Sequence, residues 1–135
     1  MKSLILYFDG TSRPNPGKSA CSYIITENNL HVIEKSGRYL GEGTNNIAEY
    51  FGLILGLIAC IKYEPSDLVI HTDSNLVVQQ INGNYRVRDK ELKNLHIVAL
   101  ELMKLFKKIK IVHVSHEKNQ AHSLAQKYLE KSLFD

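Results

Sequence analysis

Three acidic side chains stand at points of the sequence where they could do chemistry together. Asp9 closes the apolar run LILYFD, and Asp73 closes the run DLVIHTD. Glu49 is the one charged residue in IAEYFGLILGLIACI, which spans residues 47–61. A lone carboxylate in so apolar a segment is seldom buried unless a partner neutralises it. If Glu49 is buried, it therefore needs a neutralising partner.

A divalent cation is one such partner. Three carboxylates within a few Å repel one another and take up protons unless a cation neutralises them. Hard oxygen ligands suit Mg²⁺ or Mn²⁺, and two such ions about 4 Å apart can activate a water and stabilise the leaving oxygen of a phosphodiester. Taken singly, each acid also has a simpler interpretation, as a turn residue (Asp9), a capping neighbour (Asp73) or a charge favoured near a helix N-terminus (Glu49). The combination favours a site.

The hydrophobic pattern predicts the elements that must position these acids. Their order is β-β-β-α-β-α-α-β-α, which indicates an α/β (α+β) mixed sheet covered by helices. If the first and fourth strands are parallel neighbours, Asp9 and Asp73 lie at the same sheet edge, where ligands bind in open α/β sheets. A helix packed across the face that Asp73 shares with His71 could aim Glu49 at the same spot. We expect strands over 4–9, 20–26, 31–40, 67–73 and 110–115, a loop over 10–19, and helices from Thr44 or Asn45 to Tyr63, over 75–81, over 90–108 and through 121–129.

Length and composition predict one soluble domain over residues 1–135. The chain is 44% hydrophobic and 23% charged, and its net charge of +3 leans mildly toward polyanionic partners. Cys21 and Cys60 have no CxxC spacing, which is typical of core thiols in a reducing compartment. No segment reaches the roughly 20 apolar residues of a membrane span. We therefore expect a cytoplasmic protein with no membrane partner.

Three blocks of the sequence resemble the catalytic blocks of ribonuclease H, in particular the compact cellular type of bacteria, archaea and plants. The blocks are YFDGTSRPNPG, GTNNIAEYFGLILGL and HTDSNLVVQQINGNY. The resemblance implies a ribonuclease H-like fold with a five-stranded mixed sheet in the order 3-2-1-4-5. It implies a monomeric endonuclease that hydrolyses the RNA strand of RNA/DNA hybrids with two Mg²⁺ or Mn²⁺ ions. The implied products carry 5′-phosphate and 3′-hydroxyl ends.

The resemblance also implies roles for individual residues. Asp9, Glu49 and Asp73 match three of the family's four acidic metal ligands. The substrate contacts would lie in the minor groove, where the 2′-hydroxyls that distinguish RNA from DNA are displayed, and at the phosphates. Asp89 departs from the pattern, because it stands where the family commonly has an Asn near a DNA-strand phosphate. The matching contact residues are Asn15, Asn45 and Asn46 for the minor groove, Thr44 for a DNA-strand phosphate, and Ser74 and Asn75 beside Asp73.

The fourth acidic position also departs from the family pattern. Where the family has a motif like N-x-x-A-D-x-L-A, this chain reads NQAHSLAQ. Alignment on Leu124 and Ala125 puts His122 at the Asp position, with Ser123 as the alternative occupant. Imidazole suits Mn²⁺ better than Mg²⁺ and can coordinate, accept a proton or orient a water. We expect His122 to fill the fourth catalytic and metal-binding role; the alternative is a solvent-facing residue at a helix start.

Two further groups of residues have both a functional and a structural interpretation. His116 falls near the loop where other family members carry a mobile active-site His. Because His113 and His116 are near His122, a His-rich zinc site must be considered. It is not favoured, since no Cys accompanies these histidines and their spacing fits no common zinc pattern. A short basic run such as that of Arg86 and Arg88 is more often a solvated loop, but the resemblance favours contact with backbone phosphates, so we expect both to bind substrate.

Three functions remain open from the sequence. The first is the hybrid ribonuclease. The second is a hybrid-binding module that has lost catalysis through the change at His122. The third is a related metal nuclease acting on DNA or double-stranded RNA. A plain nucleotide-binding protein is not favoured, because the chain contains no P-loop and no GxGxxG motif.

Overall fold

Residues 2–28 and 30–131, which the computed structural model describes, form five strands, four α-helices and one 3₁₀ turn. The strands are β1 (Ser3–Arg13), β2 (Gly17–Glu27), β3 (His31–Gly43), β4 (Asp67–Thr72) and β5 (Ile109–His113). The helices are α1 (Asn45–Ile61), α2 (Asn75–Ile81), α3 (Lys90–Met103) and α4 (His122–Lys131), with the 3₁₀ turn η1 (His116–Lys118) before α4.

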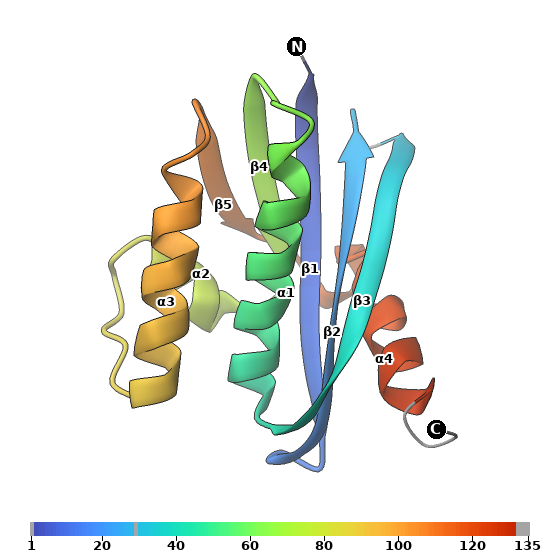
Figure 1. Ribbon diagram of the computed structural model, residues 1–135, viewed down its shortest axis with the longest axis vertical. Coiled ribbons are helices and arrows are strands. Elements are labelled where there is room, and N and C mark those ends of the chain that lie inside the picture. Colours follow the sequence, from blue (N-terminus) through green and yellow to red (C-terminus); the bar gives the residue numbers. More distant parts are fainter. Residues whose placement is uncertain (1, 29, 132–135) are drawn as a thin grey trace.

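The strands make one mixed sheet in the order β3-β2-β1-β4-β5 (Figure 1). The pairs β1–β2 and β2–β3 are antiparallel, and the pairs β1–β4 and β4–β5 are parallel. Parallel neighbours need a crossover connection, and α1 supplies it between β3 and β4, while α2 and α3 supply it between β4 and β5. The predicted element order and strand order are both confirmed.

Helices cover both faces of the sheet. In Figure 1, α1 and α3 lie over one face and α4 over the other. The larger core lies under α1, where Leu6 and Phe8 of β1 and Leu53 of α1 are fully buried. The α4 face has a smaller core that includes Tyr7 and Ala121, because successive strand residues point to opposite faces. No helix in the described part of the chain is both long and apolar enough to span a membrane.

Two glycines let α1 lie directly on β1. A Cβ atom at Gly10 would stand 2.2 Å from the main-chain carbon of Ala48 and 2.2 Å from the main-chain nitrogen of Glu49. A Cβ at Gly52 would stand 2.7 Å from the carbonyl oxygen of Asp9. Side chains larger than hydrogen have no room at either position, so glycine sets the distance between the two elements. This contact fixes Glu49 at the level of Asp9.

The largest differences from the predicted bounds of the strands and helices are at two places. The expected loop over 10–19 is mostly sheet, because β1 and β2 stay paired as far as Arg13 and Lys18 and leave only a short turn containing Pro14 and Pro16. The helix expected to reach residue 108 stops at Met103. Leu105, which seemed to continue its apolar stripe in the sequence, is 65% exposed.

Candidate active site

The edge of the sheet beyond β4 brings Asp9 and Asp73 together. The parallel pairing of β1 with β4 runs only as far as Tyr7 and His71, and β4 ends one residue later. β1 continues past this point through its pairing with β2. Asp9 is therefore inside its strand, and not at the strand end as predicted, but it lies just beyond the last β4 partner. Asp73 follows β4 directly, so both carboxylates lie where β4 stops.

Glu49 reaches this edge from the opposite layer. His71 packs edge-on against Tyr7, with ring centroids 5.1 Å apart, on the face that α4 covers. The prediction that the Glu49 helix packs across this face is wrong, since α1 covers the other face. The Glu49 carboxylate accepts a hydrogen bond from Ser74, the residue after Asp73. Glu49 thus approaches Asp9 and Asp73 from the α1 face of the sheet, where β4 has ended and no longer separates the two faces.

Asp9 and Glu49 both bind protons more tightly than free carboxyl groups do. Burial raises the pKa of Asp9 to about 6, with a further contribution from the charge of Asp73, and His122 offsets part of the rise. Burial likewise raises the pKa of Glu49 to about 8, against the lowering effect of Ser74 and with added repulsion from Asp9 and Asp73. Clustered acids with this behaviour offer oxygen ligands that a divalent cation would stabilise in the charged form. The donor set therefore fits Mg²⁺ or Mn²⁺.

His122 lies beside Asp9 at the first turn of α4. Its Nδ1 is 3.0 Å from Asp9 Oδ2, and its side chain is 31% exposed. With a carboxylate as acceptor, Nδ1 carries the proton and donates it. The other ring nitrogen, Nε2, is 3.4 Å from Nε2 of Gln126. Ser123, the alternative occupant, is exposed, so the structure brings His122 and not Ser123 to the carboxylates.

Asp73 has a partner on each oxygen. His116 Nδ1 is 2.9 Å from Asp73 Oδ2, and Asn119 Nδ2 donates to Asp73 Oδ1 at 2.9 Å. The same Asn119 nitrogen donates to the carbonyl oxygen of Phe8 at 2.9 Å, and Asn119 Oδ1 accepts from the amide of Ala121 at 3.1 Å. Asn119 thus joins β1, Asp73 and the start of α4. Sequence analysis gave it no role, although it opens the NQAH motif.

The minor-groove candidates gather near the start of α1. Asn45 Oδ1 accepts from the amide of Ser12 at 2.7 Å, and the Asn45 amide donates to Asn15 Oδ1 at 3.1 Å. Thr44 is the N-cap of α1 and accepts from the amide of Ile47 at 3.2 Å. Asn46 lies in the same first turn and is partly exposed. These side chains therefore line the surface where the β1–β2 turn meets α1.

The remaining candidates lie on the α2 side of the site. Ser74 caps α2 by accepting from the amide of Val77 at 3.3 Å, and Asn75 is exposed in the first turn. Arg86 and Arg88 are both exposed on the connection between α2 and α3. Asp89 caps α3 by accepting from the amide of Leu92 at 3.0 Å, which explains an acidic residue there without a phosphate contact.

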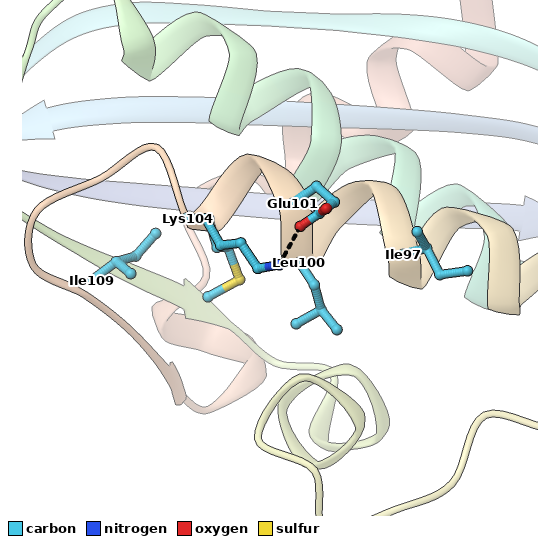
Figure 2. Close-up of a pocket in the computed structure, with 6 residues that line it drawn as sticks. Ile97, Leu100, Glu101, Lys104 and Ile109 are labelled. Carbon is cyan, nitrogen blue, oxygen red and sulfur yellow. Dashed lines mark ion pairs between the residues drawn. The ribbon is translucent and has the colours of Figure 1, made fainter.

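A separate apolar hollow of about 500 Å³ lies on α3 and the start of β5 (Figure 2). Ile97, Leu100 and Ile109 line it, and an ion pair between Glu101 and Lys104 crosses its rim. None of the candidate site residues contributes to it. The carboxylate site is a sheet edge and not this hollow.

Comparison with known proteins identifies the family. The family model described as "Reverse transcriptase-like" matches residues 7–128. The chain is 32% identical over 130 residues to "Ribonuclease H" of Campylobacter concisus, covering 89% of this chain and 87% of that protein. The chain belongs to the ribonuclease H family. It is also 34% identical over 125 residues to "Ribonuclease HI" of Halobacterium salinarum, which covers 92% of this chain and 63% of that protein.

Solved structures of the ribonuclease H family share the whole fold. The N-terminal RNase H domain of Rv2228c from Mycobacterium tuberculosis superposes with a TM-score of 0.94 at 30% identity, covering 98% of this chain and 97% of that chain. LC11-RNase H1, solved in complex with an RNA/DNA hybrid, superposes with a TM-score of 0.90 at 31% identity, covering 96% and 99%. The chain spans only 63% of the H. salinarum protein and 32% of full-length Rv2228c.

Proposed function

We propose that this chain is a ribonuclease H: an endonuclease that hydrolyses the RNA strand of RNA/DNA hybrids and leaves 5′-phosphate and 3′-hydroxyl ends. The observation that carries the proposal is the convergence of Asp9, Glu49, Asp73 and His122 at the end of β4. Family membership supports it, as does the hybrid bound by the structural neighbour LC11-RNase H1.

Two divalent cations, Mg²⁺ or Mn²⁺, would supply the activation of water and the stabilisation of the leaving oxygen. Asp9, Glu49 and Asp73 would hold them through carboxylate oxygens, which suit both ions. His122 would contribute a ring nitrogen, with its Nδ1 proton held by Asp9 at 3.0 Å. A nitrogen in the fourth position favours Mn²⁺ over Mg²⁺, because imidazole is a better ligand for the later metal.

The substrate would lie across the edge that carries the acids. Side-chain amides can donate to and accept from a 2′-hydroxyl, which is the group that distinguishes RNA from DNA. The exposed guanidinium groups of Arg86 and Arg88 would bind backbone phosphates farther along the duplex. The proposed minor-groove contacts are Asn15, Asn45, Asn46 and Asn75, with Thr44 and Ser74 beside them at the starts of α1 and α2.

We also propose that residues 1–135 act as one domain and as a monomer. Every proposed catalytic group comes from this one chain, from β1, α1, the residue after β4 and α4, so the site needs no second subunit. Cys21 and Cys60 are both buried free thiols, which suits the reducing cytoplasm.

The role of His122 can be tested by replacing it. In Mn²⁺, His122→Ala should lower hybrid cleavage by about tenfold or more, because it removes a ligand that Asp9 orients. Ser123→Ala is the matched control and should cleave like the parent chain, since Ser123 is exposed. Unchanged kinetics of His122→Ala in both Mg²⁺ and Mn²⁺ would contradict the proposed role.

A hybrid-binding module without catalysis is the second candidate. It is favoured by the departure at His122, which places an imidazole where the family pattern has a fourth carboxylate. This alternative predicts tight binding of the hybrid and an intact RNA strand in either ion. Cleavage in Mg²⁺ or Mn²⁺ would exclude it.

A further inference from the structure

Two histidines from separate elements lie against each other beside Asp73. His116 opens η1 and His122 opens α4, and their ring centroids are 3.9 Å apart at an interplanar angle of 62°. Each of Asp73, His116 and His122 offers one ligand atom, and these atoms all lie within 4.8 Å of one another. Glu49 does not belong to this group. Two imidazoles and one carboxylate therefore converge on one point at the rim of the carboxylate site.

The spacing of the ligand atoms in this group is close to that of a metal site, with a shared proton between His116 and Asp73 where the ion would lie. His116 Nδ1 and Asp73 Oδ2 are 2.9 Å apart. Two ligands that each stand about 2.0–2.1 Å from one cation are separated by about 3 Å, so little movement is needed to replace the proton. His122 is already oriented by the Asp9 carboxylate at 3.0 Å, which is the arrangement that fixes metal-bound imidazoles.

We propose that Asp73, His116 and His122 form a binding site for one transition-metal cation of the zinc class, such as Zn²⁺ or Co²⁺. Two nitrogen ligands select this class over Mg²⁺, which prefers oxygen. The sequence did not favour a His-rich zinc site, because no Cys accompanies the histidines and their spacing fits no common zinc pattern. The fold instead pairs His116 with His122, and water can complete a tetrahedral set.

Asp73 belongs both to this site and to the proposed hydrolytic site. If the proposed function holds, an ion bound here should therefore affect hydrolysis. A zinc-class ion that holds Asp73 Oδ2 withdraws this oxygen from the cations of the hydrolytic site. Low concentrations of Zn²⁺ should therefore inhibit hybrid cleavage supported by Mg²⁺ or Mn²⁺.

Metal binding itself can be measured without any nucleic acid. Chelator-treated protein is titrated with Co²⁺ and followed by its visible absorption, and Zn²⁺ binding is measured by calorimetry. We expect one ion per chain and the intense absorption of a low-coordinate Co²⁺ centre. His116→Ala and His122→Ala should each weaken binding by about tenfold or more. His116 is 59% exposed, so its removal leaves the core intact.

Two control variants locate the site. Glu49→Gln should keep Co²⁺ and Zn²⁺ binding, because Glu49 is outside the group. His31→Ala removes an exposed histidine at the start of β3 and should change nothing. Undiminished binding by the His116→Ala/His122→Ala double variant would overturn the proposal, as would loss of binding in Glu49→Gln. A chain that fails to cleave hybrids but binds Co²⁺ in this pattern would contradict only the proposed function.

Discussion

Asp9 and Glu49 are acids that bind protons more tightly in the folded chain than in the unfolded chain. Burial is the main cause for both, and the charges of neighbouring carboxylates add to it. The site is thus destabilised by its own negative charge when no cation is bound. Raised pKa values in a cluster of carboxylates support the proposal that Asp9 and Glu49 hold a cation.

The metal-free protein should lose stability as pH rises. Both acids are protonated in both states below their ordinary pKa values of 3.8 and 4.5, and the folded state keeps its protons up to about 6 for Asp9 and about 8 for Glu49. Between these limits the folded state binds more protons, so the free energy of unfolding falls with pH. This fall can be measured by urea unfolding of the protein in chelator, from about pH 5 to about pH 8. Glu49→Gln should flatten the slope above about pH 6, and an unchanged slope would contradict the assignment.

Asn119 should be more important for stability than its polar character suggests. Asn119→Ala removes the hydrogen bonds that this buried side chain donates to the Phe8 carbonyl and to Asp73. We expect a loss of about 1–3 kcal/mol in the free energy of unfolding. The matched control is Asn84→Ala, whose exposed side chain donates to Gln79 Oε1 at 2.7 Å; it should change stability by less than about 0.5 kcal/mol. Equal losses in the two variants would contradict the linking role.

The sequence predicted individual site residues unevenly. The apolar runs made three acids conspicuous, because each run is interrupted or ended by a charge: Asp9, Glu49 and Asp73. The resemblance to ribonuclease H then implied that all three bind metal. Asn119 gave no such signal, because its three partners come from β1, from the residue after β4 and from the chain before α4. The sequence could not decide between His122 and Ser123, because the decision depends on where α4 begins. In the structure the first turn of α4 points His122 toward Asp9 and leaves Ser123 exposed to solvent.

At the scale of elements, the contact between α1 and β1 sets the geometry of the site. Gly10 and Gly52 remove the side chains that would separate the two backbones. The sequence predicted α1 as a helix and β1 as a strand from their apolar patterns. It could not predict which face of the sheet α1 covers, because Glu49 can reach the same edge from either side. It also predicted β1 and β2 as too short. The prolines and glycines indicated a loop, but the two strands stay paired as far as Arg13 and Lys18 and confine Pro14 and Pro16 to the turn.

Gly52→Ala should therefore impair hydrolysis by moving α1. Its Cβ would meet the main-chain oxygens of Asp9 at 2.7 Å and Ser22 at 3.1 Å, and backbone atoms cannot turn aside. A shift of about 1 Å in Glu49 can lower the rate by about a hundredfold. Gly56→Ala is the matched control on the same helix, because its Cβ meets the movable end of the Leu6 side chain at 2.6 Å. Single-turnover cleavage of folded protein should fall only for Gly52→Ala; equal rates would contradict the account.

In the whole molecule, the five-stranded sheet brings the candidate catalytic residues together at one edge, where β4 ends. The strand order was predictable from element order together with the resemblance, and it is confirmed. Surface charge is a weaker guide, since the net charge of +3 is small and lysines lie on several elements. Placing the basic residues in the fold separates Arg86 and Arg88, between α2 and α3, from the lysines that follow α3.

Hybrid affinity should depend on salt through these arginines. Arg86→Ala and Arg88→Ala should each lower the slope of log affinity against log salt by about 1, because each would remove one of the proposed phosphate contacts. Lys107→Ala, an exposed cation between α3 and β5, should leave the slope unchanged. Equal slopes for all three variants, measured by fluorescence anisotropy of a labelled hybrid in chelator, would contradict the phosphate role.

Hydrolysis is tested most directly by cleavage of an RNA/DNA hybrid labelled on the RNA strand, in Mg²⁺ and separately in Mn²⁺, with Asp73→Asn as the control. We predict RNA fragments with 5′-phosphate and 3′-hydroxyl ends, an intact DNA strand, greater activity in Mn²⁺, and no cleavage by Asp73→Asn. An intact RNA strand in both ions, with the hybrid still bound, would contradict hydrolysis and leave the chain as a hybrid-binding module.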